Sequence, residues 1–176
     1  MARYVALLRG INLGARNRVP MARLREIVEQ QGARNVRTYI ASGNVICDST
    51  ESATRLRSKL ECAIEAEFGF NIIVAVVTPT ELRKVVEGNP YQNAQPGTLH
   101  VAFTTTPLTA EERLAVAKFN SPPEELSAAK SHVYLHLPKG FGAGQANREV
   151  DKLIGKRATI RNWRTVETLA RMAAQK

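Results

Sequence analysis

The chain has 176 residues, of which 44% are hydrophobic and 23% charged, and this balance is that of a globular protein and excludes a disordered chain. With 25 Lys and Arg against 16 Asp and Glu, the formal net charge is +9. No apolar run approaches the roughly 18 residues of a membrane span, the N-terminus is too soon interrupted by Arg for a signal peptide, and two cysteines exclude a disulfide framework. We therefore expect a soluble, reduced, cytoplasmic protein with no membrane contact.

Charge is distributed unevenly along the chain. Residues 1–60 carry 11 basic and 4 acidic side chains, residues 61–136 carry 5 and 9, and residues 137–176 carry 9 and 3. Of the basic residues 17 are Arg, whose planar fork of donors suits phosphate and carboxylate groups. Two basic ends suit an anionic partner, whereas the alternative is that the Arg content reflects genomic base composition and the side chains are simply solvated.

Hydrophobic periodicity predicts six elements in the first half. They are a strand at 3–8, a helix at 20–31, strands at 36–40 and 44–48, a helix at 51–67 and a strand at 71–77. Pro20 suits the first position of its helix, and Ser42-Gly43 supplies a tight turn between two strands. The order β-α-β-β-α-β predicts a ferredoxin-like half, in which two helices cover one face of a four-stranded antiparallel sheet.

The second half repeats this order. A short helix opened by Thr78 ends at Gly88 and leads into a linker at 88–97 that is rich in Gly, Pro, Asn and Gln. The elements that follow are a strand at 99–104, a helix at 109–119, strands at 125–129 and 132–137, a helix at 144–154, a strand at 158–160 and a last helix at 162–173. We predict an α+β protein with a first ferredoxin-like domain at 1–78, a helix and linker at 79–97, and a second ferredoxin-like domain with a C-terminal helix at 98–176.

The first and fourth strands, at 3–8 and 71–77, are apolar on both faces. An isolated sheet of this kind leaves one face in water and shows alternation, so both faces of this sheet are expected to be covered. The second domain, the C-terminal helix and a second subunit are the three candidates, which makes a homodimer or tight interdomain packing the expectation.

The loop Arg9–Arg18 and the turn Ser42–Asn44 are predicted to meet at one edge of the first sheet, because the first two strands run parallel. The loop is longer than an ordinary connection, carries three Arg with two Gly and two Asn, and leads into a helix N-terminus. Such a segment can bind an anion through guanidinium groups and backbone N–H groups. The alternative is a connector whose Asn side chains satisfy their own backbone. The candidate ligand-binding residues here are Arg9, Asn12, Arg16, Asn17, Ser42 and Asn44.

Arg161 and Arg164 flank the start of the last helix, where the helix dipole disfavours cations. A carboxylate partner or a bound anion would explain them. We therefore add both residues to the candidate anion site.

Other motifs are weaker. Residues 138–144 spell G-x-G-x-G but match neither a dinucleotide-binding nor a Walker loop. Alternation predicts that His100, His132 and His136 share the polar face of the second sheet, but no carboxylate stands out to orient a zinc triad. Cys47 and Cys62 are predicted to be buried thiols. We expect no metal and no cofactor.

A family resemblance lies in four stretches: Tyr4–Gly14, Val19–Met21, Val36–Val45 and Ala158–Val166. Together they resemble the bacterial family called domain of unknown function 1697. The resemblance implies a two-domain α/β protein of ferredoxin-like halves and brings no reaction, cofactor or catalytic residue. Family members often carry a Ser-Lys pair after the glycine turn near Gly142, and this chain has Ala143-Gly144-Gln145 instead.

Three functional hypotheses remain open. The first is a binding protein for an anionic, phosphate-bearing small molecule or nucleic acid at the Arg9–Asn17 loop. The second is an enzyme that uses this loop and the Ser42–Asn44 turn, which the absence of a recognisable acid–base pair disfavours. The third is a structural or oligomeric module without a small-molecule ligand.

Overall fold

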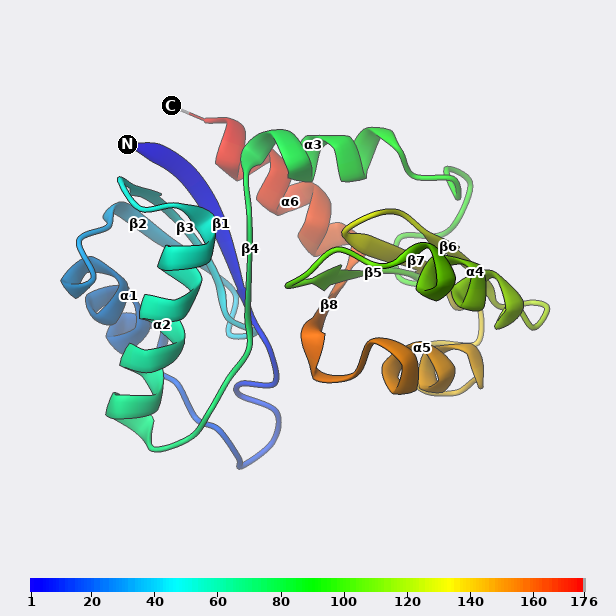
Figure 1. Ribbon diagram of the computed structural model, residues 1–176, viewed down its shortest axis with the longest axis horizontal. Coiled ribbons are helices and arrows are strands. Elements are labelled where there is room, and N and C mark those ends of the chain that lie inside the picture. Colours follow the sequence, from blue (N-terminus) through cyan, green and yellow to red (C-terminus); the bar gives the residue numbers. More distant parts are fainter. Residues whose placement is uncertain (176) are drawn as a thin grey trace. The chain divides into compact units, whose positions relative to one another are not determined.

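The computed structural model describes residues 1–175 as two compact units. One unit comprises Met1–Lys84 together with the chain from Leu169 onward, and the other comprises Val85–Thr168. The sequence-based division placed the last residues with the second domain, whereas they pack with the first unit. In chain order the elements are β1 (Ala2–Leu8), α1 (Met21–Gln30), β2 (Arg34–Tyr39), β3 (Asn44–Ser49), α2 (Ala53–Phe68), β4 (Val74–Val77), α3 (Pro79–Glu87), β5 (Leu99–Thr104), α4 (Ala110–Lys118), β6 (Glu125–Ala128), β7 (His132–His136), α5 (Ala146–Ile154), the 3-10 turn η1 (Gly155–Arg157), β8 (Ala158–Asn162) and α6 (Trp163–Ala174) (Figure 1).

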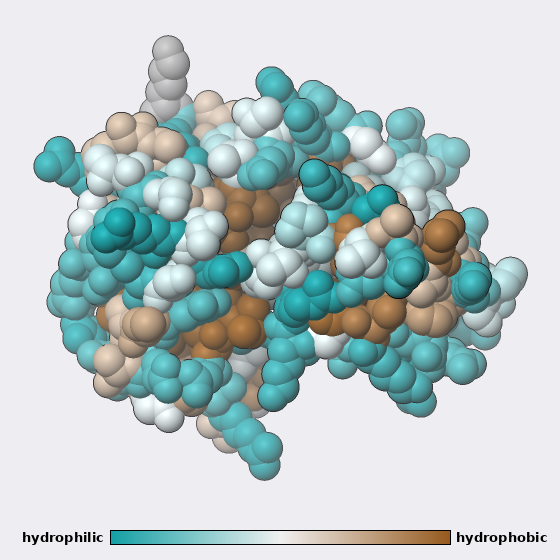
Figure 2. All heavy atoms as spheres, in the orientation of Figure 1, coloured by the Kyte–Doolittle hydropathy of each residue, from teal (hydrophilic) through white to brown (hydrophobic). Residues whose placement is uncertain are grey.

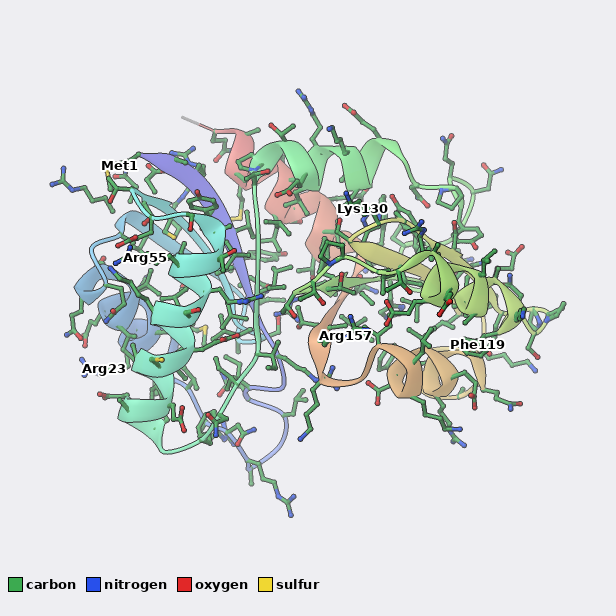
Figure 3. All side chains as sticks on the ribbon, viewed as in Figure 1. Met1, Arg23, Arg55, Phe119, Lys130 and Arg157 are labelled. Atoms are coloured by element: carbon green, nitrogen blue, oxygen red, sulfur yellow. The ribbon has the colours of Figure 1, made fainter. Side chains whose placement is uncertain are left out.

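The predicted fold class is confirmed, because the chain forms two four-stranded antiparallel sheets with interleaved helices and a C-terminal helix. The strand order of the first sheet is β2-β3-β1-β4. Helices α1 and α2 cover one face of this sheet (Figure 1). An ion pair joins these helices on their outer side, where Arg23 Nε lies 2.6 Å from Glu67 Oε1 (Figure 3).

Strand β1 is buried on both faces, as its composition predicts. Tyr4, Ala6 and Leu8 lie in the core under the helices, while Val5 and Leu7 on the opposite face are 0% exposed. The last turn of α6 lies on this opposite face. Its carbonyls accept from the sheet: Arg37 Nη2 donates to Met172 O at 2.8 Å, and Arg3 donates to Gln175 O. The C-terminal helix, one of the three predicted covers, is therefore found against that face.

Strand β4 begins at Val74, three residues later than predicted. Its ladder with β1 starts at the pair Leu8–Val74, where β1 ends, and a hydrogen bond from Arg9 N to Ile73 O at 2.9 Å closes that end of the strand pair. Alternation and apolar composition alone could not show where the partner strand ends.

Polar side chains fix the ends of several helices. Thr109 and Glu112 form the predicted capping box of α4, in which each side chain bonds the other's backbone N–H. The same exchange opens α3, where Glu81 Oε2 accepts from Thr78 N at 2.7 Å and Glu81 N donates to Thr78 Oγ1 at 3.2 Å. These pairs satisfy helix N–H groups that have no partner within the helix.

The second sheet has the order β6-β7-β5-β8, and its core lies under α4 and α5. Its register corrects the prediction that the three His share a face. His100 is paired with Leu135, a residue of the helix-covered core, whereas His132 is paired with Phe103 on the other face. Alternation within each strand was predicted correctly, but the pairing register decides how the faces of two strands match.

The prediction of two buried thiols is half wrong. Cys47 on β3 is buried, and burial raises the pKa of its thiol to about 11. Cys62 on α2 is exposed. The buried stripe of α2 is Leu56, Leu60 and Ile64, and Cys62 lies on the opposite side of the helix.

Hydrophilic side chains cover most of the face shown in Figure 2. The large apolar side chains that are exposed include Leu13, Ile40, Leu114 and Phe141. Among the described helices none is long and apolar enough to cross a membrane.

The burial of Val5 predicts the effect of a charge on the face opposite the helices. Val5→Asp should lower the free energy of unfolding by more than about 3 kcal/mol, because it places an unpaired carboxylate in an apolar site. Ala2→Asp, at the exposed start of the same strand, should change it by less than about 0.5 kcal/mol. Urea unfolding of both variants measures the difference, and equal stability would show that this face is open.

The environment of His132 predicts a pH dependence. Burial lowers the pKa of His132 to about 4, and within residues 1–175 neither ring nitrogen has a hydrogen-bond partner. The unfolded chain binds this proton near pH 6.5, so stability should fall as the pH drops from about 6.5 towards 4. His132→Phe should flatten the fall measured between pH 7 and 5, a range above the titration of the carboxylates. An unchanged slope would show that His132 accepts its proton in the folded protein.

Candidate functional site

The loop after β1 lies beside the β2–β3 hairpin, at the sheet edge where topology predicts it. Leu8 N donates to Gly43 O at 2.8 Å, and Asn12 Nδ2 donates to Ala41 O at 2.8 Å. The loop and the hairpin therefore form one surface of the first unit.

Asn12 is the central anchor of the loop. Its side chain donates to Val19 O at 2.9 Å and accepts from Val19 N at 2.8 Å, in addition to the bond to Ala41. The backbone of Asn12 has φ 55°, a left-handed conformation that Asn tolerates better than most residues. The Asn12 amide thus ties both ends of the loop to the hairpin.

Asn17 closes the tip of the loop. Its carbonyl accepts from Asn12 N at 3.0 Å, and its side-chain Nδ2 donates to Gly10 O at 3.1 Å. Residues 13–16 therefore form a turn that is held at its base. The Asn side chains stabilise the backbone, which is the role that the connector hypothesis gives them.

The hairpin residues are also structural. Asn44 is fully buried, and its Nδ2 donates to Tyr39 O at 2.9 Å and to Ser42 Oγ at 3.0 Å. Gly43 has φ 79°, and a Cβ there would lie 2.7 Å from Ile11 Cδ1 and 2.8 Å from Leu8 Cβ. Only glycine fits this turn, because it brings the hairpin against the start of the loop.

The Arg side chains are what this surface presents to solvent. Arg16 and Arg18 are exposed and form no ion pair within residues 1–175, and Arg9 is partly exposed. The adjoining helix α1 has no side-chain cap and no acidic residue in its first turn. The first acidic residue of the sequence is Glu26, so the loop itself contributes positive charge alone.

Two exposed apolar side chains border the same surface. Leu13 at the loop tip is 71% exposed and Ile40 in the hairpin is 50% exposed. They adjoin Asn12 and Ala41, the residues that hydrogen-bond the loop to the hairpin. Ile40 also has φ 51°, a strained conformation for a β-branched residue.

Arg161 and Arg164 belong to the second unit. Arg161 on β8 is buried, and its Nη1 donates to Thr159 Oγ1 at 2.8 Å and to Ile160 O at 2.9 Å. Burial lowers its pKa to about 10. Arg164 is exposed, and its backbone N–H donates to Asn162 Oδ1 at 3.0 Å. The role of these two residues in binding an anion stays a prediction.

The glycine-rich segment before α5 is occupied by the protein's own carboxylate. The side chain of Glu124 is buried, and its Oε2 accepts from Ala146 N at the start of α5 at 2.9 Å. A Cβ on Gly144 would overlap this carboxylate. An anion would have to displace Glu124, so the G-x-G-x-G pattern does not form a phosphate site in this arrangement.

Sequence reasoning missed a pocket in the second unit. The linker predicted at 88–97 forms one side of it, and Glu125 and His136 form the other. Four amide residues in ten positions of the linker were the available signal. Elsewhere, no group of three or more metal-ligating side chains occurs within residues 1–175.

The comparisons with known proteins identify the family and a related fold. The family described as "Protein of unknown function (DUF1697)" matches residues 1–134. No curated protein matches the chain. A solved structure, that of conserved bacterial protein SP0830 from Streptococcus pneumoniae, is similar with a TM-score of 0.77 and 24% sequence identity over 99% of each chain. That likeness shows the fold alone, whereas the family match over residues 1–134 shows that the chain belongs to the DUF1697 family.

Proposed function

We propose that the protein is a cytoplasmic binding protein for an anionic, phosphate-bearing ligand, which it recognises with the loop between Arg9 and Arg18. The observation that carries this proposal is that Arg16 and Arg18 are exposed, on a loop of fixed shape, and form no ion pair with any residue from 1 to 175. Both cysteines are free, which suits the reducing cytoplasm.

Fixed loop geometry favours binding. The amides of Asn12 and Asn17 hold the backbone, so the loop loses little conformational freedom when a ligand binds. Guanidinium groups on such a loop can meet phosphate oxygens in paired hydrogen bonds. The uncapped first turn of α1 adds backbone N–H groups and the positive end of a helix dipole.

A binding protein that catalyses no reaction is better supported than an enzyme that uses the same loop and hairpin. Residues 9–19 contain no Asp, Glu, His or Cys, and neither does the hairpin at 40–44. The Ser42 hydroxyl accepts from Asn44 Nδ2, and no general base stands beside it in the sequence of the loop or hairpin. The exposed Leu13 and Ile40 favour a ligand that joins an apolar or aromatic part to its phosphate.

A matched pair of double variants tests the proposal. Arg16→Ala/Arg18→Ala should weaken binding of ATP, or of a short single-stranded oligonucleotide, by at least about tenfold, since charge-assisted hydrogen bonds contribute about 1.5–3 kcal/mol each. Arg25→Ala/Arg34→Ala removes the same charge from exposed positions outside the loop and should have little effect. Calorimetry with ATP and fluorescence anisotropy with the oligonucleotide separate a small phosphate ligand from a nucleic acid.

The salt dependence gives a second readout. If both Arg residues contact phosphates of a single strand, the slope of log affinity against log salt should fall by about 0.7 for each lost contact. If the two double variants weaken binding equally, binding depends only on the net charge of the protein, and this result would contradict a site at the loop. If neither ATP nor the oligonucleotide binds the wild type, the loop is a structural connector.

A further inference from the structure

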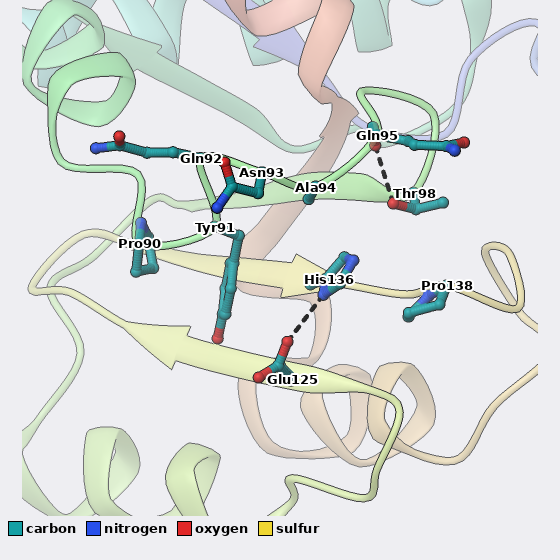
Figure 4. A pocket seen from close by; sticks show the side chains of 10 residues that line it. All are labelled: Pro90, Tyr91, Gln92, Asn93, Ala94, Gln95, Thr98, Glu125, His136 and Pro138. Carbon is teal, nitrogen blue, oxygen red and sulfur yellow. Dashed lines mark hydrogen bonds and ion pairs between the residues drawn. The ribbon is translucent and has the colours of Figure 1, made fainter.

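The second unit contains a cavity of about 610 Å³, within the range of small-molecule sites (Figure 4). Its walls come from the linker, from β6 and from β7. The side chains that matter chemically are Tyr91, Gln92, Asn93, Gln95, Glu125 and His136.

The linker that forms the cavity is ordered by hydrogen bonds. Tyr91 N donates to Asn89 Oδ1 at 2.8 Å, and Ala94 N donates to Tyr91 O at 3.0 Å. Thr98 bonds Gln95 O through both its N–H and its hydroxyl, each at 2.9 Å. From the far side, Asn162 Nδ2 donates to Pro96 O at 3.2 Å. The cavity is thus pre-formed although its wall is rich in Gly, Pro and amides.

Two rings and a carboxylate make up one wall. The centroids of Tyr91 and His136 lie 5.5 Å apart with their planes inclined by 30°. His136 Nδ1 lies 3.0 Å from Glu125 Oε2, as the dashed line in Figure 4 shows. Because an ionised carboxylate only accepts, Nδ1 of His136 donates in this contact.

Amide side chains of the linker also line the cavity. The side chains of Gln92, Asn93 and Gln95 form no hydrogen bond within residues 1–175, and Figure 4 shows them on the linker above the ring wall. Each amide offers donors and an acceptor together. No Lys or Arg lines the cavity, and Glu125 is its one acidic side chain.

We propose that this cavity binds a flat, uncharged nitrogen heterocycle of the nucleobase type, stacked on the Tyr91–His136 wall and held at its edge by the amides. Stacking on aromatic side chains favours the binding of a flat ring, whichever base it is, because every base has a π-face. Asn and Gln pair with edges that carry a donor beside an acceptor, and a carboxylate accepts from an exocyclic amino group. The absence of cationic side chains disfavours a phosphate here, in contrast to the loop of the first unit.

The three His rings allow the site to be tested directly. In a titration with adenosine, cytidine or uridine, followed by the ring-nitrogen NMR signals, His136 should shift while His100 and His132 stay in place. Adenosine and its 5′-monophosphate should bind the cavity equally, because no cation there contacts the phosphate. A longer oligoadenylate that shifts His136 at lower concentration would identify a base within a strand, rather than a free nucleoside, as the source of the ligand.

A tyrosine pair supplies the control. Tyr91→Leu should weaken the binding of adenosine by about tenfold through loss of stacking, whereas Tyr39→Leu, at a partly exposed tyrosine of the first unit, should not. Well-dispersed NMR spectra confirm that both variants fold. The proposal is overturned if no nucleoside shifts His136, or if Tyr91→Leu binds adenosine as tightly as the wild type.

Discussion

The double burial of β1 is the constraint on which the first unit depends. Val5 and Leu7 are as fully buried as Ala6 and Leu8, so the strand is stable only while both faces of its sheet are covered. Helices α1 and α2 cover one face, and the last turn of α6, almost the whole chain away, lies on the other. The Arg3 and Arg37 side chains bond the carbonyls at the end of α6, which satisfies groups that have no partner within a helix.

The candidate site is a consequence of where this strand ends. Directly after Leu8 the chain leaves the core, and Gly43 allows the hairpin to contact Leu8 and Ile11. The side-chain amides of Asn12 and Asn17 then hydrogen-bond the loop backbone. The guanidinium groups are therefore the groups of the loop that can contact a ligand. The two proposed sites differ in the charge they favour: the loop suits an anion, while the cavity of the second unit contains one carboxylate and no Lys or Arg.

Much of this fold could be predicted from the sequence, because periodicity and turn residues mark each element and the βαββαβ order restricts the topology. The meeting of the loop with the hairpin follows from the parallel direction of β1 and β2. Properties that depend on pairing register could not be predicted, and His100 faces the helix-covered core for that reason. The same limit applies to the cavity, since hydrogen bonds from Asn162, 66 residues away from Pro96, help to order its linker. Composition also does not reveal that the Asn12 side chain bonds both Val19 and Ala41, because this depends on the geometry of its amide.

An NMR titration of the backbone amides with pyrophosphate would test whether the loop between Arg9 and Arg18 is an ordered anion site. Saturable shifts should concentrate in residues 9–19 and in the first turn of α1, where backbone N–H groups adjoin the exposed Arg16 and Arg18. Shifts scattered over basic residues of both units, or none in residues 9–23, would contradict it.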